Sequence, residues 1–288
     1  METVKIIECP RDAMQGITEF IPTAKKIQYI NELLKCGFDT LDFGSFVSPK
    51  AIPQLSDTVE VLSKLDLSAA STKLLAIIAN ERGAEQAVQF DEIGFLGYPF
   101  SVSETFQMRN TNASIEESWK RLEGITNLTA KNNKELVVYL SMGFGNPYGD
   151  PWNADVVINW SEKLHRELGI KILALSDTIG SASPAIVSSL FNKLIPALPG
   201  VEFGAHLHTV PENAASLVKA AYESGCRRFD GAIKGFGGCP MAADSLTGNM
   251  PTEKMLDWFS SENIETHVNR EQFDNAMALS ATVFPLNH

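Results

Sequence analysis

The feature that most limits the fold of this chain is a regular alternation of strand-like and helix-like segments along almost its whole length. The segment 4–8 is short and hydrophobic, and the segment 23–35 that follows carries Ile27, Ile30 and Leu34 at helical spacing. The eight predicted pairs, strand first, are 4–8 with 23–35, 40–43 with 58–65, 73–79 with 83–90, 92–96 with 114–132, 136–142 with 153–168, 172–176 with 184–195, 201–208 with 212–223, and 228–233 with 252–261.

Eight strand–helix units in about 250 residues predict a TIM (β/α)8 barrel. Short hydrophobic strands without strict alternation suit a parallel sheet that is covered on both faces. A doubly wound α/β sheet is the alternative, but no G-x-G-x-x-G follows the first strand, where a dinucleotide-binding fold would carry it. We therefore predict one domain over 1–288, with the barrel at about 1–262 and a short helical C-terminal appendage at about 263–288.

Charge and cysteine usage exclude several classes of partner. The chain has 24 Lys and Arg against 35 Asp and Glu, a net charge of -11, which argues against nucleic acid. The apolar run 136–142 is far shorter than the roughly 18 residues that cross a bilayer, so no membrane is expected. The cysteines Cys9, Cys36, Cys226 and Cys239 show no C-x-x-C spacing, and no signal-like segment precedes the first strand, which favours a cytoplasmic location with free thiols.

In a barrel the chemistry gathers where the strands end, so polar residues at those positions are candidates for function. The first strand is followed by Arg11 and Asp12, a cation and a carboxylate side by side that could also be a loop salt bridge. The second strand contains Asp42 near its end, and a buried acid is costly unless it is paired or catalytic.

The seventh strand ends with His206 and His208, and residues two apart in a strand share a face. Both imidazoles would then point into the barrel mouth and could bind one ion. Together with Asp12 and an amide from later in the chain, they predict an exchangeable divalent ion in roughly octahedral geometry. The alternative is that the histidines cap the following helix.

Two further rim segments are candidates. After the eighth strand, Gly237 and Gly238 precede Cys239 in a glycine-rich loop whose backbone could approach a ligand closely, with the thiol as an acid or base. After the sixth strand, Asp177 is either a functional carboxylate or a cap of the next helix. The other three cysteines lie in or beside apolar segments and are expected to be buried.

Taken together, these motifs resemble those of the 3-hydroxy-3-methylglutaryl-CoA lyase family of metal-dependent TIM-barrel lyases, over almost the whole chain. The motifs are Pro10-Arg11-Asp12 with Gln15, Ser45 to Lys50 with Pro53-Gln54, Ser114 to Ser118, Ser176 to Gly180, His206-Leu207-His208, Gly237 to Pro240, and Gly248-Asn249 before Thr252-Glu253.

The resemblance implies cleavage of 3-hydroxy-3-methylglutaryl-CoA (HMG-CoA) to acetyl-CoA and acetoacetate with Mg²⁺ or Mn²⁺, no nucleotide cofactor beyond the CoA of the substrate, a place in leucine degradation and a homodimer. It implies the metal ligands Asp12, His206, His208 and Asn249, the catalytic residues Arg11, Asp42 and Cys239, and the substrate-binding residues Arg11, Gln15, Asp177, Gly237 and Gly238. Lys50 and Arg82 are candidates for the CoA phosphates.

Several positions depart from the family pattern. Asp42 stands where the family usually has Glu, Ala13-Met14 replaces Gly-Leu, and Thr209 replaces the Asp that follows the second histidine. The segment between Cys239 and Asn249 is one residue longer than in the family pattern. A carboxylate shorter by one methylene reaches about 1.5 Å less far, so these changes bear on the substrate more than on the fold.

Two other functions remain open from the sequence. The first is a related barrel aldolase or synthase that acts on another 3-hydroxyacyl-CoA or on a 2-oxo acid, although the chain after Ser261 is short for the regulatory region typical of the condensing synthases. The second is a barrel that binds a metal or ligand without catalysis, which would be expected to have lost a ligand or the thiol.

Overall fold

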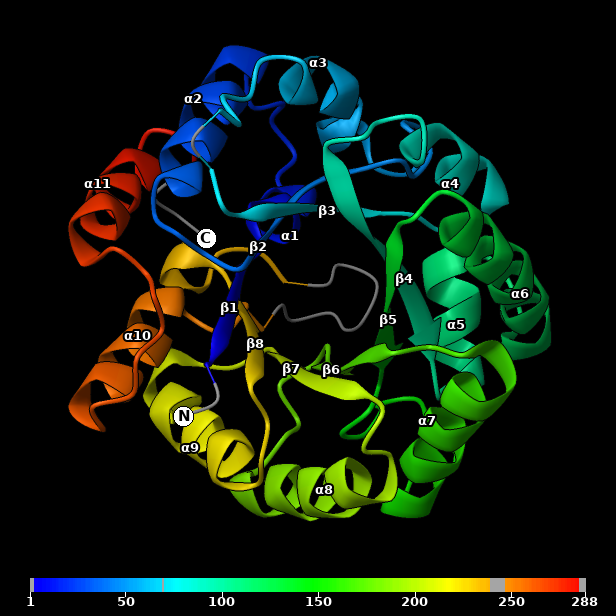
Figure 1. Cartoon of the computed structure of the whole chain (residues 1–288). Coiled ribbons are helices and arrows are strands. Elements are labelled where there is room, and N and C mark those ends of the chain that lie inside the picture. Colours follow the sequence, from blue (N-terminus) through cyan, green and yellow to red (C-terminus); the bar gives the residue numbers. More distant parts are fainter. Residues whose placement is uncertain (1–2, 69, 239–246, 285–288) are drawn as a thin grey trace.

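The protein is described by a computed structural model in which residues 3–68, 70–238 and 247–284 are placed. Eight parallel strands form a closed barrel in sequence order, with the last strand paired to the first (Figure 1). The strands are β1 (Lys5–Glu8), β2 (Thr40–Ser45), β3 (Lys73–Ile77), β4 (Ile93–Ser101), β5 (Glu135–Ser141), β6 (Ile172–Asp177), β7 (Glu202–Leu207) and β8 (Arg228–Gly231). The predicted TIM barrel is confirmed.

A ring of helices surrounds the barrel (Figure 1). The helices are α1 (Pro10–Gln15), α2 (Thr23–Leu34), α3 (Thr58–Leu62), α4 (Glu81–Ala87), α5 (Glu104–Thr111), α6 (Ile115–Lys131), α7 (Ala154–Leu168), α8 (Pro184–Ala197), α9 (Ala214–Glu223), α10 (Thr252–Ser261) and α11 (Arg270–Ser280), with short 3-10 turns η1 (Pro53–Leu55), η2 (Pro211–Asn213) and η3 (Ile233–Gly235). The predicted C-terminal helix is α11, which packs against α2.

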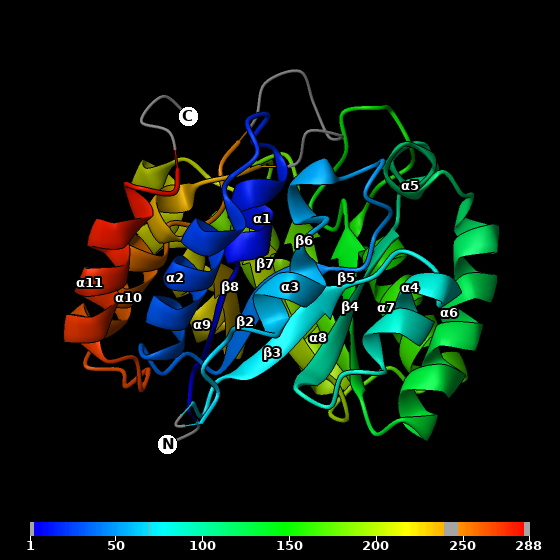
Figure 2. The ribbon, with the colours of Figure 1, turned by 90° about the horizontal axis from the view of Figure 1, so that it is seen from above.

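Figure 2 shows the barrel from the side, with the amino terminus at one end and α1 at the other. Because α1 follows β1 directly and all strands are parallel, the end that carries α1 is where all the strands finish. In the described part of the chain, no helix combines the length and the apolar character needed to cross a bilayer.

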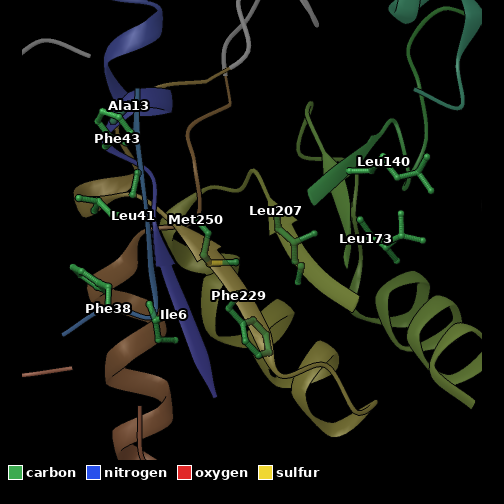
Figure 3. Packing of buried hydrophobic residues seen from close by; sticks show 14 of the residues in the cluster. Ile6, Ala13, Phe38, Leu41, Phe43, Leu140, Leu173, Leu207, Phe229 and Met250 are labelled. Carbon is green, nitrogen blue, oxygen red and sulfur yellow. The ribbon is translucent and has the colours of Figure 1, made fainter. Parts of the chain in front are cut away.

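Side chains along each strand alternate between the outer face of the barrel and its interior. One set of side chains packs outward against the helices, and Figure 3 shows Ile6, Leu41, Leu173, Leu207 and Phe229 in this layer. The other set fills the barrel interior along β3 to β6 and comprises Leu75, Ile77, Phe95, Val137, Tyr139, Ile172 and Ala174.

The other half of the interior is polar. His206 alternates with outward Ala205 and Leu207, while Asp230 and Arg228 lie on either side of outward Phe229. All the charged side chains here are buried, which is costly unless each has a partner. This polar half lies next to the strand ends that carry the predicted site.

Helix α1 was not predicted, and it changes the position of two site residues. Pro10 begins the helix, where its fixed φ and missing N–H are tolerated. Arg11 and Asp12 therefore lie on the first turn of a short helix and not on an extended continuation of β1. Gln15, one turn later, accepts a hydrogen bond from Nη1 of Arg11 at 2.7 Å.

The family motif Ser114 to Ser118 has a structural role at the start of α6. Ser114 accepts from the backbone N–H of Glu117, whose carboxylate accepts from the backbone N–H of Ser114, so that the two form a capping box. The Ser118 hydroxyl lies 2.7 Å from the hydroxyl of Tyr98 on β4. This motif therefore fixes the outer helix to the barrel.

Glu8, at the end of β1, ties the first strand to the segments around the chain's glycine-rich loop. Its two carboxylate oxygens accept from the backbone N–H of Ile233 at 2.8 Å and from the hydroxyl of Thr252 at 2.6 Å. Burial raises the pKa of Glu8 from 4.5 to about 8, because the hydrogen bonds only partly offset the loss of solvation.

We expect Glu8 to make the protein less stable as the pH rises. Between pH 4.5 and about 8 the folded chain keeps a proton on Glu8 that the unfolded chain has lost, so the free energy of unfolding falls across this range. Glu8→Gln cannot ionise, and its melting temperature should fall less over the same range. Thermal unfolding at a series of pH values measures this, and parallel losses in both proteins would contradict it.

Candidate active site

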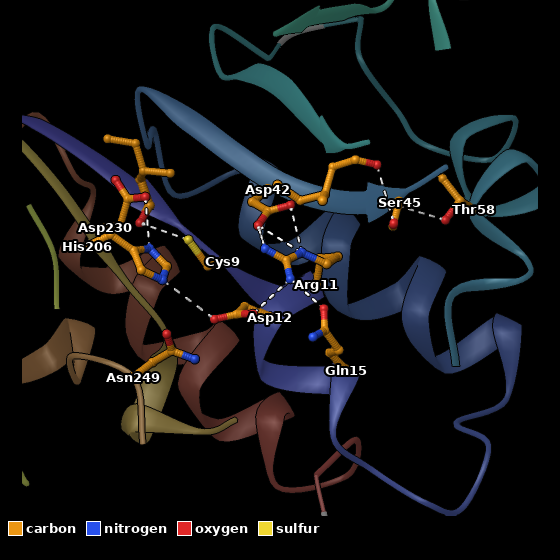
Figure 4. Close-up of polar contacts among 12 residues, drawn as sticks. Cys9, Arg11, Asp12, Gln15, Asp42, Ser45, Thr58, His206, Asp230 and Asn249 are labelled. Atoms are coloured by element: carbon orange, nitrogen blue, oxygen red, sulfur yellow. Dashed lines mark hydrogen bonds and ion pairs between the residues drawn. The ribbon is translucent and has the colours of Figure 1, made fainter. Parts of the chain in front are cut away.

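Three predicted metal ligands meet at the barrel mouth. Oδ2 of Asp12 lies 3.8 Å from Nε2 of His206 and 3.8 Å from Nε2 of His208 (Figure 4 shows Asp12 and His206). The two imidazole rings are 5.5 Å apart between centroids. Because His206 is on β7 and His208 is just beyond its end, the strand places both rings on one face.

The other nitrogen of each histidine ring has its own partner. Nδ1 of His206 lies 3.1 Å from Oδ2 of Asp230, and Nδ1 of His208 lies 3.1 Å from the backbone carbonyl oxygen of Thr247. A carboxylate oxygen and a carbonyl oxygen accept hydrogen bonds, so in the neutral form of each ring Nδ1 carries the hydrogen and the Nε2 lone pair faces Asp12. Such a pattern is typical of metal-binding histidines.

Asn249 completes this cluster. It forms an isolated antiparallel bridge with His208, and its Nδ2 donates to the carbonyl oxygen of Phe236 at 2.9 Å. Gly237 has φ +90°, and a Cβ there would lie 2.6 Å from the backbone oxygen of Asp12 and 2.9 Å from Nδ2 of Asn249. A glycine is therefore required where the loop approaches the site.

The donor set fits a divalent ion. A carboxylate oxygen and two imidazole nitrogens lie within 4.8 Å of one another, and an amide side chain is next to them. Oxygen and nitrogen donors of this kind suit Mn²⁺ and similar ions, whereas thiolate donors suit softer ions.

Arg11 is held by a dense set of hydrogen bonds beside these ligands (Figure 4). Its Nε and Nη2 donate to the carboxylate of Asp42, with the shortest distance 2.6 Å, and its Nη1 donates to Asp12 at 2.8 Å and to Gln15. A guanidinium has five N–H groups, so these contacts leave one Nη2–H without a partner among the described residues.

The charges of the cluster shift its pKa values. Burial alone would raise the pKa of Asp12, but Arg11 and the two histidines outweigh it and hold the pKa below its usual value. Burial likewise opposes the charged form of His206, yet Asp230 raises its pKa, whereas burial and the neighbouring His206 lower the pKa of His208. The cluster therefore favours an ionised Asp12 next to a neutral His208.

Asp42 is fully buried behind Arg11. Burial raises the pKa of Asp42 to about 6, although the attraction of Arg11 opposes this rise. The register of β2 against β3 shifts between Asp42 and Gly44, and such bulges often redirect a side chain near an active site. Asp42 is not among the residues that line the cleft described next.

A cleft with an empty volume of about 730 Å³ opens over this cluster. Its floor carries Arg11, Asp12 and both histidines, and its walls combine apolar and hydroxyl or amide side chains. The lining residues are Arg11, Asp12, Gln15, Val47, Ile52, Ile77, Ala79, Pro99, Phe106, Asn110, Thr111, Tyr139, Ser141, Ser176, Thr178, His206 and His208.

The other predicted site residues lie in different surroundings. The carboxylate of Asp177 accepts from the backbone N–H groups of Ile179, Ser181 and Ala182, so it holds the loop before α8, and its predicted contact with substrate stays a prediction. Asp177 is not the cap of α8, which was the alternative that the sequence left open, because the N-cap is Ser183, whose hydroxyl accepts from the backbone N–H of Ile186.

Gly237 and Gly238 line a second cleft next to the first, whose wall also includes Lys234 and Phe236. Cys239 lies outside the described residues. Lys50 and Arg82 are exposed and line neither cleft. The three other cysteines are buried and unbridged, as predicted.

Tyr139 and Asp230 belong to the site but were not predicted from the sequence. The ring of Tyr139 packs edge-on against His206 with centroids 5.3 Å apart, and its hydroxyl is buried with no hydrogen-bond partner among the described residues. Asp230 carried a usable signal, because it is an acid within a short buried strand, like Asp42.

Comparisons with known proteins show the family of this chain. A family model described as HMGL-like matches residues 4–279. A hydroxymethylglutaryl-CoA lyase of Bacillus subtilis is 36% identical over 267 residues, which cover 93% of this chain and 88% of that protein.

Two solved structures are similar over nearly the whole chain. A Bacillus subtilis HMG-CoA lyase superposes with a TM-score of 0.90 at 33% identity, covering 98% of this chain and 94% of that one. An HMG-CoA lyase from Acinetobacter baumannii, in complex with coenzyme A and 3-methylmalate, superposes with a TM-score of 0.89 at 29% identity. The match covers 98% of this chain and 91% of that one.

Proposed function

This chain belongs to the HMGL-like family, and from that premise we propose how its cleft carries out the reaction of a hydroxymethylglutaryl-CoA lyase. The protein is a carbon–carbon lyase, and the reaction is the cleavage of HMG-CoA to acetyl-CoA and acetoacetate. The observation that carries the proposal is the convergence of Asp12, His206 and His208 beside Arg11 on the floor of one cleft.

The proposed metal ligands are Asp12, His206, His208 and Asn249. When bound, a divalent ion such as Mg²⁺ or Mn²⁺ would act as a Lewis acid that lowers the pKa of the tertiary hydroxyl of the substrate. The residues themselves are arranged for this role, because both Nε2 lone pairs and a carboxylate oxygen already face one point.

Arg11 is proposed to stabilise the oxygen of the acetyl-CoA enolate that forms as the carbon–carbon bond breaks. Its unpaired Nη2–H is available for this oxygen, and its hydrogen bonds to Asp12, Gln15 and Asp42 hold the guanidinium in one orientation. A donor that is fixed before the reaction stabilises the developing charge without further reorganisation. Gln15, which also lines the cleft, is proposed as a substrate contact.

Asp42 is proposed to act through Arg11. Its carboxylate bonds Arg11 from behind the cleft, so its contacts support a positioning role more than direct transfer of the substrate's proton.

We expect Asp42→Ala to lose most of its turnover and Asp42→Glu to retain activity, because only Glu preserves the ion pair with Arg11. Protonation of Asp42 as the pH falls through about 6 would weaken that pair, so kcat/KM of the parent should decline on the acid side of this value. In Asp42→Asn, which is neutral at every pH, activity should be low and this limb absent. Parent-like turnover in Asp42→Ala would make Asp42 a purely structural acid.

Cys239 is proposed to supply the proton that the enolate carbon needs, from a loop that closes the cleft against water. The placement of Gly237 against Asp12 supports this, because it brings the chain just before Cys239 to the metal ligands. Gly237 and Gly238 are proposed to contact substrate through their backbone.

Cys239→Ser should lower kcat and leave the affinity for Mn²⁺ nearly unchanged, because a hydroxyl is a far weaker acid than a thiol. Steady-state kinetics and a metal titration on the same preparation test this. Normal turnover in the variant would assign the proton to another group.

The acyl-CoA is the proposed small-molecule partner, and we further propose a homodimer, a cytoplasmic location and a place in leucine degradation. The acidic net charge of -11 supports a small-molecule partner over nucleic acid.

The test of the substrate compares HMG-CoA with its analogue that lacks the 3-methyl group, 3-hydroxyglutaryl-CoA, and with acetyl-CoA plus a 2-oxo acid, each with Mn²⁺. The proposal expects HMG-CoA to give the highest kcat/KM. Faster cleavage of the analogue would make a related 3-hydroxyacyl-CoA the proposed substrate. Condensation of acetyl-CoA with the 2-oxo acid, without cleavage of HMG-CoA, would contradict the proposal.

A further inference from the structure

The ring of His206 lies between two groups of possible metal ligands. Its Nε2 faces Oδ2 of Asp12, together with His208. On its other side, Cys9, His206 and Asp230 also offer ligand atoms that lie within 4.8 Å of one another. Figure 4 shows Cys9 and Asp230 on the side of the ring away from Asp12. One imidazole therefore has two faces that an ion could use.

Asp230 occupies the second face. It is paired in register with His206 across β7 and β8, and its Oδ2 lies 3.1 Å from Nδ1 of the ring. Its Oδ1 is buried and has no hydrogen-bond partner among the described residues. Among the described residues, Nδ1 of His206 is thus the one side-chain hydrogen-bond partner of this carboxylate, and a buried acceptor with so few donors holds that hydrogen firmly.

A buried cation lies one layer below Asp230. Arg228 is two residues earlier on β8, so it points to the same interior side, and it is 1% exposed. Its Nη1 lies 3.5 Å from Oε1 of Glu202, while its Nε and Nη2 have no partner among the described residues. The guanidinium and the carboxylate of Asp230 therefore balance each other's charge inside the barrel.

We infer that Asp230 is a positioning residue that keeps the hydrogen of His206 on Nδ1 and so directs the metal ion to the Asp12 face of the ring and away from Cys9. Arg228 is its buried counter-charge. This inference rests on the proposed metal site, because it assigns a cause to the orientation of one of its ligands.

The chemistry of the two faces explains why such a residue matters. The Asp12 face offers oxygen and nitrogen donors to an exchangeable ion, whereas the other face offers the thiol of Cys9, which favours softer ions such as Zn²⁺ or Cd²⁺. An ion could use Nδ1 only after displacing its hydrogen. The hydrogen bond to Asp230 opposes that displacement.

The first test needs only the parent protein. In the metal-free protein, ¹⁵N NMR of the histidine rings should show His206 with its hydrogen on Nδ1, assigned by comparison with His206→Gln. Co²⁺ bound through Cys9 would give a thiolate-to-cobalt absorption band that is missing in Cys9→Val. We expect the parent with added Co²⁺ to show no such band. A neutral His206 ring with its hydrogen on Nε2 and not on Nδ1, or such a thiolate band, would overturn the inference.

The second test measures Mn²⁺ affinity by electron paramagnetic resonance in Asp230→Leu, Asp230→Asn and the parent. Leu removes the acceptor and should weaken binding about 10- to 100-fold, as for other partners of metal-binding histidines. Asn keeps an oxygen acceptor and should bind between Leu and the parent. Asp57→Asn, which removes another buried carboxylate, one that pairs with Lys26, is the matched control and should bind like the parent.

The outcomes separate the two proposals. Equal Mn²⁺ affinity in the parent and a folded Asp230→Leu overturns the inference and leaves the proposed function intact. A parent that binds no divalent ion contradicts the proposed metal site, and the inference fails with it. An equal loss in Asp57→Asn would show a general effect of removing a buried acid and would also overturn the inference.

Discussion

Treatment of the purified protein with a chelator should abolish turnover of HMG-CoA, and added Mn²⁺ or Mg²⁺ should restore it. The reason is that the tertiary hydroxyl of the substrate has a pKa far above neutral, and among the described residues the one arginine or lysine that lines this cleft is already paired. Arg11, the cation on that floor, already bonds Asp12, Gln15 and Asp42. A bound divalent ion can lower the pKa of a coordinated oxygen by several units.

Variants of the proposed ligands should behave like the chelated parent. His208→Ala removes an Nε2 that faces Asp12 and should reduce both metal affinity and kcat strongly. His165 lies on the outer helix α7 and bonds the carbonyl oxygen of Ile170, so its replacement is the matched control and should leave both unchanged. Full activity in the presence of excess chelator would contradict a metal-dependent reaction.

Arg11→Lys should lower kcat by about 100- to 1,000-fold with a smaller effect on KM. Removing one fixed donor to a developing oxyanion typically costs about 3 kcal/mol. An ammonium group cannot reproduce the planar fork that binds Asp42 through two nitrogens while also bonding Asp12 and Gln15. The lysine would therefore lose the orientation of the charge more than the charge itself.

Steady-state kinetics with HMG-CoA at saturating Mn²⁺ measure this effect. The melting temperature and the Mn²⁺ affinity of Arg11→Lys must also be recorded, because a loss of structure or of metal would lower kcat indirectly. If Arg11→Lys is folded, binds Mn²⁺ and turns over like the parent, Arg11 is part of a structural ion pair.

The barrel was predictable because eight strand–helix units repeat along the chain, and each strand is short and hydrophobic. The elements that were missed have local physical reasons. β4 continues to Ser101, although Gly97 and Pro99 both disfavour strands, since its pairing with β5 supplies the stabilisation that the residues themselves lack. Helix α1 is only six residues long, too short for periodicity to reveal.

The ligand cluster was predictable in part. His206 and His208 are two residues apart on a strand, so their shared face follows from strand geometry alone. Their convergence with Asp12 required the closed barrel, because β1 and β7 meet only when β8 pairs with both.

Contacts that depend on side-chain direction could not be predicted. The sequence shows Asp177 and Asp230 equally as acids near strand ends. In the structure Asp177 binds its own loop, whereas Asp230 binds a metal-ligand candidate. Likewise, the burial expected for Asp42 was predictable, but its pairing with Arg11 and the register shift in β2 next to it were not.

The most direct test of the central claim is to quantify both products from HMG-CoA with the purified protein and Mn²⁺. We expect acetoacetate and acetyl-CoA in equal molar amounts, and neither product from a folded Asp12→Asn variant, whose weakened metal site lacks the carboxylate that lies between both histidines. Folded, Mn²⁺-loaded parent protein that forms no acetoacetate from HMG-CoA would contradict it.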